Sequence, residues 1–178
     1  MQKLCEVSLE VYLAAGNPFD VVSRPEVCDR CGRVGCFHRH GTYERYVGSR
    51  VVKVARFLCV LCSLSVSLLP CFVLPYRNQL VQKVDAYFMA EQQRRVEMSD
   101  MDLLRRYWRE WMGHFDTIQR DTGWPAGEPL KRKPKGYWQQ IRRTAGTIEA
   151  AQRHLTGCYG ISLLRRYACH KRPRHFDC

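Results

Sequence analysis

The sequence predicts an α+β protein, in which a small antiparallel sheet built around four cysteines is followed by a mainly α-helical bundle. Two observations support this prediction. Two Cys-x-x-Cys pairs, at 28–31 and 59–62, enclose a stretch rich in β-branched and aromatic residues, which favour strands. From residue 79 onwards, apolar residues recur at spacings of three and four, the pattern of helices that bury one face. We therefore expect two domains, 1–77 and 78–178.

The two cysteine pairs have the spacing of a four-thiolate zinc site. Each pair makes a tight knuckle that brings two sulfurs to one ion, and two knuckles that face each other complete a tetrahedron. Gly32 directly follows the first pair, where such a knuckle needs a residue that tolerates positive φ. The predicted ligands of one structural Zn²⁺ are Cys28, Cys31, Cys59 and Cys62.

Other interpretations of these cysteines stay open. They could be unrelated residues of a core, because unbonded cysteines are often buried. Cys36, His38 or His40 could also take one ligand position, since zinc accepts imidazole as well as thiolate. Four cysteines already close a tetrahedral site, so we expect the two histidines to be exposed strand residues.

Short strands fill the N-terminal half. A strand is expected at 3–7, and Ser8 is a suitable N-cap for a helical turn over 9–15. The elements expected between and after the knuckles are a strand at 42–47, a turn at 48–49, a strand at 50–57 and a strand at 63–69. The order of knuckle, hairpin and knuckle predicts an N-terminal zinc ribbon.

The stretch 57–76 carries no charge and is long enough to span a bilayer. Pro70 and Pro75, three serines and a cysteine knuckle argue against a membrane helix there. The alternation of polar and apolar residues over 63–68 is that of a half-buried strand. We expect 68–77 to be an apolar connector that packs in a core.

Helical patterns dominate the C-terminal half. A first helix is expected from Gln79 to about Arg95, and a second begins at Ser99, with Asp102 where a capping box carries Glu or Gln. A short turn between these two helices would make a helix-turn-helix. The apolar stripe of the second helix consists of Met101, Leu104, Trp108, Trp111, Phe115 and Ile118.

A last helical region follows a basic linker at 131–135 and begins near Gly136. Residues 161–167 favour a further short helix, and 170–175 form a basic tail. The apolar face of the main helix consists of Trp138, Ile141, Ala145, Ile148, Ala151 and Leu155.

The chain carries a large excess of positive charge. Its 29 lysines and arginines against 17 acids give a formal charge of +12. Such an excess favours a polyanionic partner, and arginine binds phosphates and guanine edges in a fork. We expect DNA rather than a membrane surface, with RNA as the other nucleic acid that fits. The predicted contact residues are Arg39, Arg45, Arg50, Lys53, Arg105, Arg106, Arg109, Lys131, Arg132, Lys133, Arg142 and Arg143.

The N-terminus and the cysteines predict a cytoplasmic location. No apolar stretch follows Lys3 as it would in a signal peptide. The paired cysteine spacing favours metal binding in a reducing compartment over disulfide bonds. We expect most of the remaining cysteines to be buried or unbonded.

Several motifs together resemble a known family. They are the stretches 8–13, 28–32, 38–41, 56–62 and the Leu-Leu-Pro to Pro-Tyr-Arg string over 68–77. They are similar to a prokaryotic family of uncharacterised zinc-ribbon proteins associated with mobile elements, and to the zinc-ribbon heads of some transposases. The resemblance covers about residues 8–90. It implies DNA binding and a location at the prokaryotic nucleoid, and it supplies no reaction.

No catalytic constellation is evident in the sequence. Metal-dependent transposases and nucleases need clustered carboxylates, whereas the acids of this chain are scattered. We expect a non-catalytic, zinc-stabilised DNA-binding accessory protein or regulator linked to a mobile element. One alternative is a protein-binding adaptor in a transposition or transcription complex, which would use its aromatic helices and the stretch 68–76. The other is a metal-dependent nuclease that uses Asp116.

Overall fold

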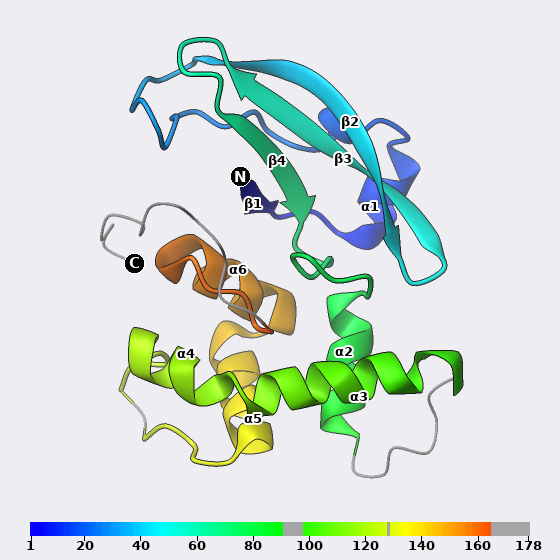
Figure 1. Cartoon of the computed structure of the whole chain (residues 1–178), viewed down its shortest axis with the longest axis vertical. Coiled ribbons are helices and arrows are strands. Elements are labelled where there is room, and N and C mark those ends of the chain that lie inside the picture. The colour runs from blue at the N-terminus through cyan, green and yellow to red at the C-terminus, as the bar shows by residue number, and fades with distance from the viewer. Residues whose placement is uncertain (91–97, 128, 165–178) are drawn as a thin grey trace. The chain divides into compact units, whose positions relative to one another are not determined.

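The structure, a computed structural model, describes residues 1–90, 98–127 and 129–164 (Figure 1). Its elements confirm the α+β class, with a four-stranded sheet in the first half of the chain and mainly helices in the second. The chain divides into two compact units, Met1–Gln79 and Leu80–Cys178.

The first unit contains a mixed sheet. Its strands are β1 (Gln2–Cys5), β2 (Phe37–Val47), β3 (Arg50–Cys59) and β4 (Ser65–Pro70), in the order β1-β4-β3-β2. As expected, β2, β3 and β4 are antiparallel neighbours, whereas β1 runs parallel to β4. A parallel neighbour needs a long crossover connection, which the chain between β1 and β4 supplies.

The hairpin of β2 and β3 is longer than the residue pattern predicts. β2 begins at Phe37 rather than at residue 42, because a β-bulge between Arg39 and Gly41 lets the strand continue past the glycine. Gly41 has a φ of +121° and Gly48, in the two-residue turn, a φ of +62°. The expected turn at 48–49 is confirmed.

Two short helices of this unit pack on β3. In α1 (Leu9–Ala14), the Ser8 side chain accepts a hydrogen bond from the Val11 amide, which confirms the predicted N-cap. The Tyr12 hydroxyl donates to the Lys53 carbonyl at 2.6 Å. In η1 (Pro18–Asp20), the Phe19 ring meets the Phe57 ring edge-on at 5.4 Å. These contacts cover the apolar side chains of the hairpin.

The connector after β4 also belongs to the first unit. Phe72, Val73 and Leu74 are almost fully buried. Arg45 on β2 donates from Nη2 to two connector carbonyls, those of Leu74 at 2.8 Å and Arg77 at 2.9 Å. The connector therefore completes the core of this unit and is fastened to the hairpin.

The uncharged stretch 57–76 contains the end of β3, the second knuckle and β4. In the described part of the chain, no helix has the length and apolar character needed to cross a membrane.

The described residues of the second unit form five helices. They are α2 (Val81–Met89), α3 (Met98–Met112), α4 (Phe115–Thr122), α5 (Pro134–Ala145) and α6 (Ile148–Tyr159). α3 is already helical at Met98, so Ser99 does not precede it as expected. α2 ends at Met89, short of the predicted end near Arg95, because Ala90 leaves the helical conformation with a ψ of 129°. The turn of a helix-turn-helix before Ser99 lies outside the described residues. Residues 161–164 are not helical.

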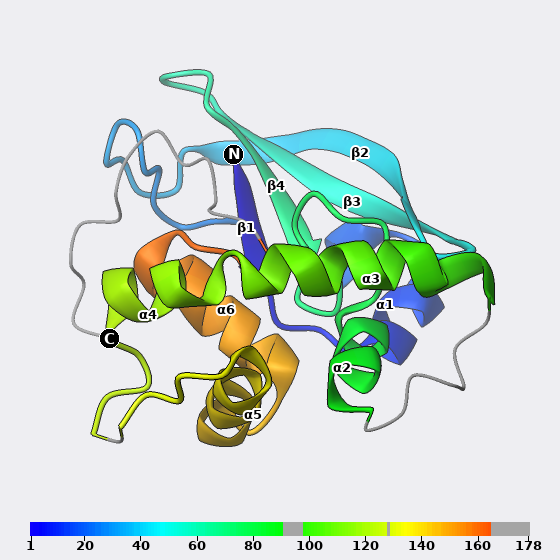
Figure 2. The ribbon, with the colours of Figure 1, turned by 60° about the horizontal axis from the view of Figure 1, so that its bottom comes forward.

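Two helical stretches that were expected to be continuous are each broken at a glycine (Figure 2). α3 ends before Gly113, and α4 begins after His114. α5 ends before Gly146, which has a φ of +83°, and Thr147 then caps α6 by accepting from the Ala150 amide. Glycine weakens a helix, which accounts for a break at Gly113 and at Gly146, and the threonine cap adds a start signal at the second break only.

Aromatic side chains form the core of this unit. Trp111 and Trp138 are fully buried, and their rings meet edge-on at 4.9 Å. Phe88 packs on Trp138 at 4.6 Å, and Tyr137 stacks on Trp111 at 5.8 Å. Of the predicted stripe, Leu104, Trp111, Phe115 and Ile118 are buried, whereas Trp108 is partly exposed.

Candidate metal centre

The two cysteine knuckles have the same backbone hydrogen bonds. In the first, the Gly32 amide donates to the Cys28 carbonyl at 2.8 Å, and the Cys28 amide donates to the Arg33 carbonyl at 3.0 Å. In the second, the Ser63 amide donates to the Cys59 carbonyl at 2.9 Å, and the Cys59 amide bonds the carbonyl five residues on. Both turns therefore hold their cysteines in equivalent positions.

The fifth residue of each knuckle has a left-handed backbone. Gly32 has a φ of +71°, as predicted, and Ser63 has a φ of +56°. Glycine adopts this conformation without steric cost, whereas serine does so only under strain of about 1–2 kcal/mol. Ser63 could not be recognised from its residue type, because serine does not indicate a positive φ as glycine does.

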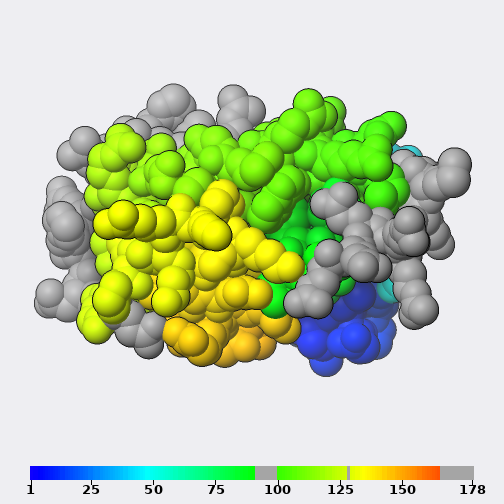
Figure 3. Space-filling view, turned by 90° about the horizontal axis from the view of Figure 1, so that it is seen from below, coloured from blue at the N-terminus to red at the C-terminus, as the bar shows by residue number. Residues whose placement is uncertain are grey.

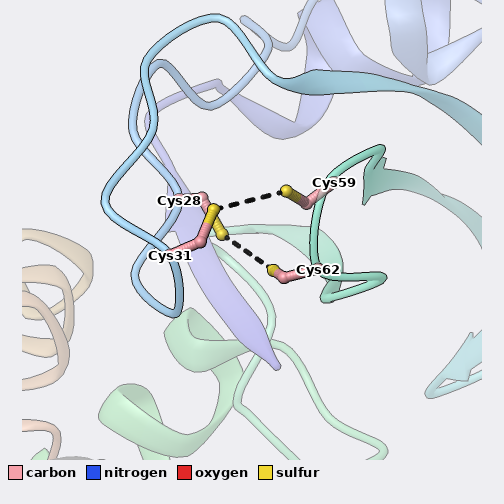
Figure 4. Close-up of side chains that lie close together, drawn as sticks. All are labelled: Cys28, Cys31, Cys59 and Cys62. Carbon is pink, nitrogen blue, oxygen red and sulfur yellow. Dashed lines mark hydrogen bonds between the residues drawn. The ribbon is translucent and has the colours of Figure 1, made fainter.

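Four sulfurs from the two knuckles point toward one another (Figure 4). Cys28 Sγ lies 3.5 Å from Cys62 Sγ, and Cys31 Sγ lies 3.7 Å from Cys59 Sγ. The four sulfurs all lie within 4.8 Å of one another. Sulfurs bound to one tetrahedral ion at about 2.3 Å are about 3.8 Å apart. The cluster therefore has the dimensions of a site for one metal ion.

The first two sulfurs to ionise come from different knuckles. Burial opposes ionisation at Cys28 and Cys59, but hydrogen bonds from backbone amides within each knuckle and from neighbouring cysteines together outweigh it. The pKa of Cys28 is lowered, and that of Cys59 is lowered to about 6. At Cys62 burial dominates and raises the pKa to about 12. A cation that binds all four sulfurs must displace the Cys62 proton, so metal binding releases protons.

The knuckles are also linked by an arginine. Arg30, in the first knuckle, donates from Nη1 to the carbonyl of Cys62 in the second at 3.2 Å. This bond crosses the cluster without using a sulfur, so it holds the two knuckles together and leaves the four sulfurs for a metal ion.

The other candidate ligands lie around this cluster. His38 and His40 are exposed on β2, as expected, with ring centroids 6.3 Å apart. Cys36 is buried, and its Sγ lies 3.4 Å from Cys59 Sγ. Cys71 is buried, whereas Cys158 in α6 is disulfide-bonded.

The predicted nucleic-acid contacts of the first unit differ in what they do. Arg45 is half-buried and holds the connector carbonyls. Arg39 is exposed, with its guanidinium 5.0 Å from the centre of the Phe19 ring. Arg50 and Lys53 are exposed on β3. Three of the four predicted residues are thus accessible to a ligand.

Three exposed arginines lie on α3, namely Arg105, Arg106 and Arg109. Arg105 makes an exposed 3.5 Å ion pair with Asp102, which contributes little to stability. Arg105 and Arg109 are one helical turn apart, and with Trp108 they line a recess of about 350 Å³. The recess is therefore lined by positively charged side chains and an aromatic ring.

The basic linker before α5 has a fixed backbone and exposed side chains. Lys131, Arg132 and Lys133 are all exposed. The Lys131 amide donates to Gln140 Oε1 at 3.0 Å, and its carbonyl accepts from Gln119 Nε2 at 2.8 Å. The linker therefore presents its charges from a defined position.

The last two predicted contacts, Arg142 and Arg143, are exposed on α5. Arg142 Nε lies 3.2 Å from Asp85 Oδ2, and Asp85 Oδ1 accepts from Trp138 Nε1 at 2.8 Å. Arg142 is thus bound within the unit, an arrangement that the sequence did not indicate. Figure 3 shows a face on which atoms of α3 and α4 (green) adjoin atoms of α5 (yellow).

Within the described residues, the four knuckle cysteines are the only group of three or more histidine, cysteine or acidic side chains placed to hold a metal ion. Compared with models of protein families, with curated proteins and with solved structures, the chain matches none.

Proposed function

We propose that Cys28, Cys31, Cys59 and Cys62 bind one structural Zn²⁺ and that the first unit is a zinc ribbon. The observation that carries this proposal is the cluster of four sulfurs from two equivalent knuckles. Four thiolates in a tetrahedron are a closed zinc shell, which leaves no position for a reacting water. The ion would therefore stabilise the fold and take no part in a reaction.

The protein as a whole would then be a non-catalytic DNA-binding protein. The excess positive charge and the exposed basic side chains on β3, α3 and the linker support this proposal. The N-terminus of α5 adds partial positive charge directly beside the linker, because helix dipoles are positive there. Phosphates are the groups that such donors bind.

The biological setting belongs to the same proposal. The cysteine motifs and the string over 68–77 resemble zinc-ribbon proteins of mobile elements. We therefore place the chain among accessory proteins or regulators at a prokaryotic nucleoid, with its helical unit supplying a helix-turn-helix.

Duplex DNA binding measured across a salt series tests this function. The logarithm of the binding constant should fall linearly with the logarithm of salt concentration, with a slope of about −0.9 for each phosphate neutralised. Replacing the side chains of Lys131, Arg132 and Lys133 by glutamine should flatten the slope. A binding constant that does not respond to salt, or to this triple variant, would contradict the proposal. The same series with duplex RNA decides between the two nucleic acids.

One observation favours a second candidate, a protein-binding adaptor. Both knuckles expose aliphatic side chains next to the cysteine cluster, which we call the knuckle patch: Val27, Val34, Val60 and Leu61. Val34 is 75% exposed and Val60 63%. Exposed apolar patches of this kind mark protein interaction sites.

The two candidate functions predict opposite results for two variants. If the protein is an adaptor, replacing Val60 and Leu61 by serine should abolish association with a co-purifying partner, and the chain should not bind duplex DNA. If it is a DNA-binding protein, the same variant should keep its DNA affinity, and only the basic-linker variant should lose it.

A further inference from the structure

A fifth cysteine lies against the candidate metal centre. Cys36 directly precedes β2, is 7% exposed, and has its Sγ 3.4 Å from Cys59 Sγ. This separation is no longer than those between the four predicted ligands, 3.5 Å and 3.7 Å. The Cys36 thiol donates to the Arg33 carbonyl at 3.2 Å, so it is held in this position. A fifth sulfur therefore lies beside the four-sulfur cluster, in contact with Cys59.

The five sulfurs differ in their access to solvent. Cys28 and Cys59 are completely buried, and Cys36 is nearly so, whereas Cys31 is exposed. Water, protons and competing ligands reach an exposed sulfur first. Cys31 is therefore the ligand most readily lost from the centre.

The chain between Cys31 and Cys36 carries little side-chain packing at its two glycines. It contains Gly32 and Gly35, both with positive φ, and no heavy atom lies within 4 Å of where a Cβ would be at either position. Neither glycine is therefore packed against another part of the chain on the side where a Cβ would lie.

We propose that Cys36 is a reserve metal ligand that replaces Cys31. The proposal rests on the zinc site proposed above. In the exchange, the metal–sulfur bond to Cys31 breaks and a bond to Cys36 forms. The Cys36 proton passes to the Cys31 thiolate, so the charge of the centre does not change. The centre keeps four sulfur ligands throughout.

Cobalt substitution tests this exchange, because Co²⁺ occupies tetrahedral thiolate sites and its charge-transfer absorption scales with the number of bound thiolates. The variants are Cys31→Ser, Cys36→Ala, and the two combined. Cys31→Ser combined with Cys71→Ala is the matched control, since it also removes a second buried cysteine. Cys36→Ser replaces Cys36→Ala where loss of packing unfolds the unit.

Cys31→Ser should keep the four-thiolate spectrum of the wild type, and so should Cys36→Ala alone and the Cys71 control. The combination of Cys31→Ser with Cys36→Ala should fall to about three-quarters of the wild-type intensity, the value for three thiolates. Zinc affinities measured by competition should rank the variants in the same way. A large loss of affinity is expected only when Cys31 and Cys36 are both replaced.

Equal three-thiolate spectra for Cys31→Ser and for its combination with Cys36→Ala would overturn the reserve-ligand role. So would loss of the metal from Cys36→Ala alone, which would make Cys36 an obligatory ligand. Either result leaves the zinc site itself intact. A wild-type protein that binds neither Co²⁺ nor Zn²⁺ would instead refute the proposed function.

Discussion

At the scale of single residues, the cysteine knuckles depend on two positions with left-handed backbone, Gly32 and Ser63. The pattern Cys-x-x-Cys-Gly predicts the first, because glycine after a knuckle is typical of positive φ. Ser63 follows the second pair in the same geometry, and only the backbone reveals it. The clustering of the four cysteines could therefore be predicted from their spacing, whereas half of the turn geometry could not.

Replacing Gly32 by alanine should weaken zinc binding. No atom lies within 4 Å of the added Cβ, so the cost comes from the backbone alone, at a φ of +71°. That cost is about 1–2 kcal/mol, and because metal binding is coupled to folding, it should appear as a loss of zinc affinity of about tenfold. Competition with a chromophoric chelator measures it.

Gly157→Ala is the control for this change. Gly157 lies in α6, lacks a positive φ, and also has open space where its Cβ would be. Alanine there should raise the stability of the helical unit by about 0.5–1 kcal/mol and leave zinc affinity unchanged. Equal zinc affinities for Gly32→Ala and the wild type would show that the first knuckle does not need its left-handed turn.

Zinc affinity should rise with pH. The pKa of Cys62 is raised to about 12, so its proton must be displaced at any ordinary pH, and affinity gains about tenfold per pH unit from this group. Cys59, with a pKa lowered to about 6, adds to the slope only below pH 6, where it too becomes protonated. Affinities measured by competition from pH 5 to pH 8 should therefore fall more steeply toward the acid end. A pH-independent affinity would exclude thiolate ligands.

At the scale of elements, hydrophobic periodicity predicted most of the strands and helices but not where helices are interrupted. The apolar stripe continues in phase through Gly113 and through Gly146, so periodicity alone joins α3 to α4 and α5 to α6. The glycines, and Thr147 with its cap on α6, were the signals that could have separated them. Likewise, pairing of β1 with β4 depends on contacts remote in sequence, which a local pattern does not contain.

The β2–β3 hairpin offers two arginines with opposite roles. Arg45→Gln should destabilise the first unit by about 1.5–3 kcal/mol, because a charged donor to the carbonyls of Leu74 and Arg77 is lost. Thermal unfolding of the zinc-loaded protein, followed by circular dichroism, measures this loss. The salt dependence of DNA binding should remain that of the wild type.

Arg50→Gln should give the reverse result. Arg50 is exposed, so its replacement should change stability by no more than about 0.5 kcal/mol. If Arg50 contacts a phosphate, the salt slope should become shallower by about 0.9. Should Arg45→Gln alone change DNA binding while the fold stays stable, the division of roles drawn from the hydrogen bonds would be incorrect.

At the scale of the whole molecule, the excess of positive charge could be read from the sequence, but not which basic side chains are bound within the fold. The sequence pattern predicted Arg45 and Arg142 as nucleic-acid contacts, together with Arg50 and Lys53. Folding binds Arg45 to carbonyls and Arg142 to Asp85, whose partners lie far away in sequence. Such long-range pairs cannot be derived from a local sequence pattern. Because they bind arginines within the fold, fewer positive side chains are available to a ligand than the composition suggests.

The two units should respond differently to a chelator. The tryptophans, Trp108, Trp111, Trp124 and Trp138, all belong to the second unit, whereas the cysteine cluster belongs to the first. Because structural zinc contributes folding free energy outright, its removal should reduce the strand signal in circular dichroism. Tryptophan emission should stay at its native wavelength, since each unit has a core of its own. A simultaneous red shift would mean that the units fold as one.

The central claim is tested most directly by the metal content of the purified full-length protein, measured by elemental mass spectrometry beside a variant in which Cys28 and Cys59 are both serine. We predict one zinc ion per wild-type chain and none in the variant, which retains one cysteine of each knuckle. A wild-type chain without zinc, or a variant that keeps the wild-type amount, would contradict the account.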